Sequence, residues 1–173
     1  TAAEPSISPD GSQVLFSVRQ FDLSTMKERS DVYLIPTDGG DAKLVAAKAH
    51  LPAWAPSGEA IAFLREAEHG LKQLWTAGSD GGNARQLTSE RLGVDAFQWS
   101  PDSQRIAYRS DVDPTAPEPD HDHDKDPMPT VVRRIRARED GVGWRGNAFR
   151  QLFTIDAAGG EPKQVTYGEG EQG

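Results

Sequence analysis

The 173 residues include no cysteine. Disulfide bonds and thiolate metal sites are therefore excluded, although the compartment stays open because many exported proteins also lack cysteine. No stretch approaches the roughly 18 consecutive apolar residues of a membrane helix, so we expect no membrane partner. The formal net charge of −8 argues against nucleic acid as a partner, because contact with a phosphate backbone needs a basic surface.

Signatures of catalysis are also missing from the sequence. There is no G-x-S-x-G nucleophile elbow, phosphate loop, H-E-x-x-H motif or dinucleotide fingerprint. His50 and His69 have no serine and acid at a recognisable spacing, and we expect both at the surface. We therefore predict no cofactor, no catalytic residue and no hydrolytic activity on this chain.

A turn recurs three times inside one apolar frame. It has the sequences Ser8-Pro9-Asp10-Gly11, Ala55-Pro56-Ser57-Gly58 and Ser100-Pro101-Asp102-Ser103, so its prolines are 47 and 45 residues apart. Proline presets φ, the polar side chain folds back on the backbone, and glycine accepts a positive φ. The positions two before and five and seven after each proline are apolar, and the last two share one face of a strand. These positions are Ile7, Val14 and Phe16; Trp54, Ile61 and Phe63; and Trp99, Ile106 and Tyr108.

A second motif follows each turn. It consists of a strand, a Gly-Gly turn suited to positive φ, and a return strand, over residues 31–45, 73–88 and 151–166. Four short strands in roughly 45 residues are typical of a β-propeller blade. We predict an all-β fold, a partial propeller of about three four-stranded antiparallel blades at 3–46, 51–88 and 95–166. The alternative is an antiparallel sandwich, which the ordered recurrence of two motifs disfavours.

Three blades leave both end blades with an uncovered apolar face. We therefore expect the chain either to self-associate or to be a piece of something longer, and we favour the second. Thr1 is not a natural start, and an upstream signal would have been lost with any missing segment. The last residues stop where the first strand of a fourth blade would be expected.

The third blade contains an insertion at about 111–149. Its first half, residues 111–126, is acidic and includes His121 and His123, which could bind a divalent metal. We prefer a solvated acidic loop, because nothing nearby supplies a rigid set of supporting groups, and we predict no metal site. The second half predicts a strand that leads to a hairpin at Asp140-Gly141. Its arginines either recognise a carboxylate or pair with the acidic half or another domain. Candidate residues for substrate gating or a domain interface are Arg133, Arg134, Arg136, Arg138, Asp140 and Trp144.

The turn, the apolar pair and the Gly-Gly hairpin together resemble the WD40-like propeller repeat of TolB-type proteins and of prolyl oligopeptidase-family peptidases. The segment RRIRAREDGVGWRGNAFRQLFTIDAAGGEPKQVT (133–166) is similar to that of bacterial acylaminoacyl-peptidase-like members. The resemblance implies a propeller that covers a C-terminal α/β-hydrolase domain with a Ser-Asp-His triad, which is absent here. Its implied partners are the rest of the propeller, that hydrolase domain and peptide substrates.

By the same resemblance, the propeller restricts entry to small peptides and excludes bulk water from the active site. The acidic half of the insertion does not match the family pattern. The second hypothesis is a non-enzymatic TolB-like propeller that scaffolds protein–protein contacts, and a carbohydrate-binding or lyase propeller is a remote third. We expect a cytoplasmic location, or a periplasmic one if an upstream signal was removed.

Overall fold

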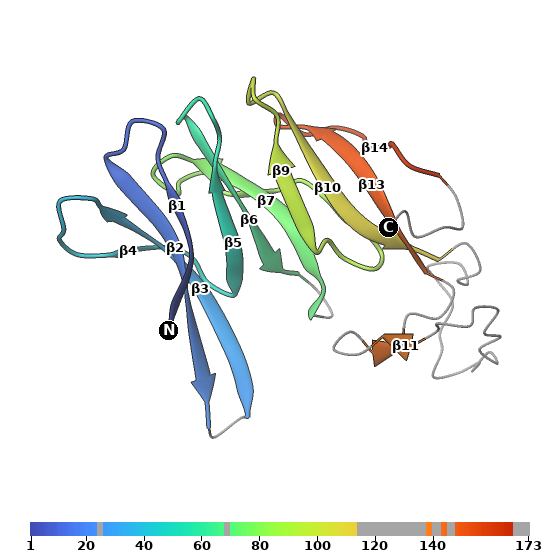
Figure 1. The fold of residues 1–173 in the computed structure, drawn as a ribbon, viewed down its shortest axis with the longest axis horizontal. Coiled ribbons are helices and arrows are strands. Elements are labelled where there is room, and N and C mark those ends of the chain that lie inside the picture. Colours follow the sequence, from blue (N-terminus) through green and yellow to red (C-terminus); the bar gives the residue numbers. More distant parts are fainter. Residues whose placement is uncertain (24–25, 68–69, 114–137, 140–142, 145–147, 168–173) are drawn as a thin grey trace.

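The computed structural model describes residues 1–23, 26–67, 70–113, 138–139, 143–144 and 148–167. Three four-stranded sheets follow one another along the chain, and each is an antiparallel meander (Figure 1). The predicted fold class, all-β with three four-stranded antiparallel blades, is confirmed. The described part of the chain contains no helix with the length and hydropathy to cross a bilayer.

Blade 1 is the first sheet, and its strands lie in sequence order. They are β1 (Ala2–Ile7), β2 (Gln13–Asp22), β3 (Lys27–Pro36) and β4 (Lys43–Ala46). Blade 2 repeats this order. Its strands are β5 (Ala49–Trp54), β6 (Ala60–Glu66), β7 (Lys72–Gly78) and β8 (Arg85–Gln86).

Blade 3 has the same layout, but its middle strands are separated by the insertion. Its strands are β9 (Ala96–Trp99), β10 (Arg105–Val112), β13 (Phe149–Asp156) and β14 (Lys163–Gln164). Between β10 and β13 the chain forms a small separate hairpin of β11 (Arg138–Glu139) and β12 (Gly143–Trp144).

The strand register explains the repeated apolar frame. The residues seven after each turn proline pair with the aromatic residues of the third strands: Phe16 with Tyr33, Phe63 with Trp75, and Tyr108 with Phe153. Two of these pairs stack, with ring centroids 5.9 Å apart in blade 1 and 5.3 Å apart in blade 3. Because side chains alternate across a strand, these aromatic residues share the face that carries the residue two before the proline.

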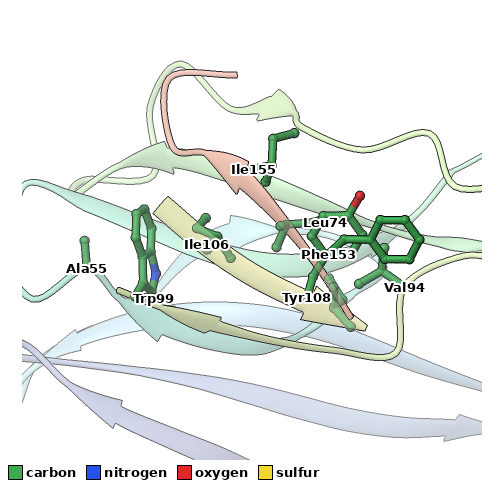
Figure 2. Close-up of a cluster of buried hydrophobic side chains, with 10 residues drawn as sticks. Ala55, Leu74, Val94, Trp99, Ile106, Tyr108, Phe153 and Ile155 are labelled. Carbon is green, nitrogen blue, oxygen red and sulfur yellow. The ribbon is translucent and has the colours of Figure 1, made fainter. Parts of the chain in front are cut away.

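We call this aromatic side of each blade its leading face, and the opposite side its trailing face. The leading face of blade 2 packs on the trailing face of blade 1, in a core that includes Trp54, Phe63, Leu15 and Val32. The leading face of blade 3 packs on the trailing face of blade 2 in the same way. Figure 2 shows this second core, with Trp99, Tyr108 and Phe153 against Leu74.

The proline turns are closed by local hydrogen bonds. In the first turn, Gly11 N–H donates to the Ser8 carbonyl (2.8 Å) and Ser8 Oγ donates to Asp10 (2.6 Å). The hydrogen bonds from Ser8 and Ser12 lower the pKa of Asp10 to about 2. Gly11 and Gly58 have φ of 74° and 76°, as predicted, and Ser103 adopts a φ of 61° at the same position in the third turn.

Candidate functional site

Most of the residues predicted for gating or metal binding lie outside the described residues. These are Arg133, Arg134, Arg136, Asp140, His121 and His123. Arg138 and Trp144 lie in the small hairpin, where Arg138 pairs with Trp144 and Glu139 pairs with Gly143 across an antiparallel ladder. The strands on either side of the predicted Asp140-Gly141 turn are therefore paired, and the turn itself lies outside the described residues.

The end of β2 and the start of β3 extend below the other sheets in Figure 1, on the side where β6 ends and β7 begins. The strands of this β2–β3 hairpin have ten residues each, against seven in β6 and β7. Its tip carries the exposed apolar side chains of Phe21, Leu23 and Met26. Sequence reasoning missed this projection, and the signal that could have found it is the F-D-L-S-T-M segment, which has no glycine turn.

The first strands of the three blades line a shallow cleft of about 350 Å³. Its walls are residues of β1, β5 and β9, among them Pro5, Leu51 and Phe97. Glu4 and Leu51 each precede a proline, have a positive φ (54° and 50°) and lie where the register of their strand shifts. This paired distortion directs a carboxylate from blade 1 onto the backbone of blade 2.

Glu4 forms a polar link between blades 1 and 2. Its carboxylate accepts hydrogen bonds from Leu51 N–H (2.8 Å), Ser17 Oγ (2.7 Å) and Arg19 Nη2 (2.9 Å). Burial raises the pKa of Glu4, but these three hydrogen bonds outweigh burial, so the pKa lies below its usual value. The carboxylate is therefore charged and fully engaged at neutral pH, which suits a structural brace better than proton transfer.

His50, expected at the surface, is partly buried beside this link, which corrects the prediction. Burial, helped by the positive charge of Lys72 and opposed by Glu4, lowers the pKa of His50 to about 4. Its imidazole is therefore neutral at pH 7. Its neighbours in β5 are the buried Ala49 and the partly buried Leu51, so alternation along the strand would not have predicted the burial of His50.

A second cleft, of about 430 Å³, lies between blades 2 and 3 beside the proline turns, at the strand ends opposite the β2–β3 hairpin. Arg85 lines it, but its guanidinium already donates to the carbonyls of Ala157 (2.6 Å) and Ala158 (2.7 Å). Trp99 also lines it, and within the described ranges its buried Nε1 has no hydrogen-bond partner. The equivalent Trp54 Nε1 donates to the carbonyl of Ser6 at 3.2 Å.

These groups do not form a catalytic centre. Within the residues that the structure describes, no hydrogen bond joins a histidine to a serine, and no three His, Cys, Asp or Glu side chains could together hold a metal ion. Glu4 and Arg85 instead link adjacent blades.

No protein-family model matches the chain. The uncharacterized peptidase YuxL of Bacillus subtilis is 25% identical over 178 aligned residues, which cover 100% of this chain and 27% of YuxL. In structure, an acylaminoacyl peptidase of Pyrococcus horikoshii matches with a TM-score of 0.75 and 18% identity, over 95% of this chain and 24% of that chain.

A propeller described as a putative TolB from Agrobacterium tumefaciens matches with a TM-score of 0.62 and 18% identity, over 95% of this chain and 48% of that chain. The chain thus spans about a quarter of the length of the two peptidases. It is a β-propeller segment that resembles a bacterial peptidase in sequence and the propellers of acylaminoacyl peptidase and TolB in fold.

Proposed function

We propose that the chain is the non-catalytic propeller part of a serine peptidase, in which it restricts the access of peptides to an α/β-hydrolase active site. The observation that carries the proposal is the match to YuxL over the whole chain, together with the fold of an acylaminoacyl peptidase propeller. Hydrolysis would follow acyl transfer through a serine that the hydrolase domain supplies.

The two projecting hairpins support a gating role. The β2–β3 hairpin and the β11–β12 hairpin lie on the same side of the sheets (Figure 1). A surface built from long connections can narrow the entrance to a cavity while the strands hold its position. The apolar tip of the β2–β3 hairpin offers a contact for an apolar peptide side chain or for the hydrolase domain.

The test uses the longer protein encoded with this chain and a series of peptides of about 3 to 20 residues. The 173-residue chain alone should hydrolyse none of them, and the longer protein should react with a fluorophosphonate probe for activated serines. Replacing Phe21, Leu23 and Met26 by serine should change the kcat/KM for long peptides relative to that for short ones. Charge reversal of Arg134 and Arg136 tests the predicted arginine strand in the same assay.

The alternative is a TolB-like scaffold without enzymatic activity, which the fold match to the Agrobacterium protein favours. A longer protein that neither reacts with the probe nor hydrolyses any peptide would support the scaffold and refute the peptidase. An active peptidase whose length preference ignores all the hairpin substitutions would refute the gating role alone.

A further inference from the structure

The first strand of each blade is an edge strand, paired with another strand on one side only. In blade 2, side chains of blade 1 occupy the free edge of β5. Leu51 N–H donates to Glu4 at 2.8 Å, and Trp54 N–H donates to Ser6 Oγ at 3.3 Å. Pro52, which lies between them, has no N–H. This part of the β5 edge therefore offers no free N–H to another chain.

The free edge of β9, in contrast, carries unpaired backbone groups. Ser100 N–H donates to the Arg105 carbonyl at 2.9 Å. Because antiparallel pairing alternates, the N–H and carbonyl groups of Phe97 and Trp99 point away from β10. Within the described residues, these four groups have no hydrogen-bond partner, and we call them the open edge. The register of β9 with β10 has no shift, and Phe97 stands where blade 2 has Pro52.

The preceding blade does not supply the acceptors that β9 lacks. Ala53 of blade 2 stands at the position of Ser6, so the hydroxyl that accepts from Trp54 N–H has no counterpart. Trp99 Nε1 also has no partner within the described residues, although Trp54 Nε1 donates to the Ser6 carbonyl. Blade 2 has all four of its strands. The open edge is therefore a property of the interface between blades 2 and 3 rather than of the ends of the chain.

An apolar cleft lies beside the open edge. It is the cleft of about 350 Å³ described above, and its lining includes Leu51, Ala53 and Phe97. Glu4, the charged residue among its described walls, is already bonded to Leu51 N–H. Natural edge strands are commonly protected by lysine or proline, but β9 has neither in its sequence Ala-Phe-Gln-Trp (96–99). Free main-chain groups beside an apolar cleft suit an extended apolar peptide.

We propose that the open edge of β9 binds such a peptide as an added strand, with one apolar peptide side chain in the cleft. Phe97 and Trp99 are two positions apart, so a peptide needs about three residues or more to bond both. Main-chain hydrogen bonds supply affinity, and the cleft supplies a preference for an apolar side chain at one position. The binding is a property of this chain. That the peptide is a substrate of a hydrolase domain rests on the proposed function.

Backbone methylation of the peptide tests for an added strand. The probe is a fluorescein-labelled peptide of about six residues in which valine and alanine alternate, titrated with the 173-residue chain and followed by fluorescence anisotropy. Two isomers carry N-methyl groups on either the odd-numbered or the even-numbered residues. One isomer places its methyl groups on the bonding edge, and the other places them on the opposite edge. We expect their dissociation constants to differ about tenfold.

Two substitutions copy the features that close the β5 edge. Phe97→Pro removes one N–H of the open edge, as Pro52 does in β5. Ala53→Ser supplies a hydroxyl for Trp99 N–H, as Ser6 does from blade 1. Each should weaken peptide binding about fivefold. Phe97→Leu keeps the N–H and an apolar side chain, so this matched control should bind the peptide about as well as the native chain. If Phe97→Pro does not fold, the smaller change Ala53→Ser carries the test.

Amide hydrogen exchange followed by NMR locates the bound peptide. Saturating peptide should slow the exchange of the Phe97 and Trp99 amides, whereas the Gln98 amide, which points toward β10, should change little. No binding at a peptide concentration of about 1 mM, equal affinity of the two methylated isomers, or binding without this protection would overturn the proposal.

The same measurements separate this proposal from the proposed function. Peptide binding at β9, in a longer protein that hydrolyses no peptide, would refute the peptidase and support the added strand. An active peptidase whose β9 amides stay unprotected by peptide would refute the added strand alone.

Discussion

Blade 2 and blade 1 have the same four strands and the same register, but within the described residues blade 2 is covered on both faces and blade 1 on one. Phe63 on the leading face of blade 2 is fully buried, whereas its equivalent in blade 1, Phe16, keeps part of its surface in water. Trp54 is 8% exposed, and the equivalent Ile7 is 61% exposed. The local sequence pattern is the same in both blades, so the neighbour determines the burial.

This difference teaches where the stability of such a repeat resides. A single sheet cannot bury either of its faces alone, and stacking supplies the missing half of each core. The cores between blades 1 and 2 and between blades 2 and 3 both draw on blade 2. Substitutions in blade 2 should therefore weaken the packing at two interfaces, whereas equivalent substitutions in blade 1 should weaken it at one.

The largest expected effect comes from truncating the buried aromatic residue. Phe63→Ala should lower the free energy of unfolding by about 3–5 kcal/mol, because it leaves a cavity between two blades. Phe16→Ala should cost only about 1 kcal/mol, since its ring is half covered. Urea unfolding followed by tryptophan fluorescence measures both, at concentrations low enough to avoid association.

If Phe63→Ala does not fold, Phe63→Leu serves in its place, with an expected loss of about 1 kcal/mol, and is compared with Phe16→Leu. Equal losses at the two positions would mean that the leading face of blade 1 is as well covered as that of blade 2. That result would contradict the comparison on which this prediction rests.

A smaller effect separates the two hairpin glycines. Gly81 and Gly39 have φ of 82° and 94°, so alanine is strained at both, but only Gly81 touches the preceding blade. Gly39→Ala should cost about 1–2 kcal/mol from the backbone alone. Gly81→Ala should cost about 1–3 kcal/mol more, because its Cβ would press on Val45. Thermal and urea unfolding of the two variants measure the difference in the free energy of unfolding. Equal losses would show that blade 2 shifts away from Val45 at no cost in stability.

The sequence was sufficient for the blades because their apolar positions and turns are local and repeated. Trp54, Ile61 and Phe63 have the spacing that the strand period requires, and the structure buries all three. What the sequence did not reveal depends on neighbouring blades. Lys43 Nζ donates to the Asp80 carbonyl of blade 2, and Arg85 donates to the Ala158 carbonyl of blade 3. The burial of His50 beside Glu4 also depends on the adjacent blade. Ser103 accepts the positive φ at which the other turns have glycine, and its Oγ accepts a hydrogen bond from Ser57 N–H at 2.8 Å.

The smallest expected effect concerns His50 in β5, on which the charges of Glu4 and Arg19 of blade 1 and of Lys72 of blade 2 act. Burial lowers the pKa of His50 to about 4 in the folded chain, against about 6.5 unfolded. Between these values the unfolded state binds more protons, so stability rises with pH. The contribution of His50 is complete above about pH 6.5 and is lost as the pH falls toward about 4. It is modest, because the imidazole keeps some contact with water.

His50→Gln isolates this contribution, since glutamine is polar but does not titrate. Urea midpoints measured from pH 7 to pH 4 should fall for the native chain and stay nearly level for His50→Gln down to about pH 4.5, the usual pKa of a free glutamate. Below that pH both chains should weaken, because the pKa of Glu4 is lowered in the folded state and protonation removes its bonds to Leu51, Ser17 and Arg19. Parallel curves between pH 6.5 and pH 5 would show that His50 titrates alike in the folded and unfolded chain. Blade 1 would then contribute nothing to its burial.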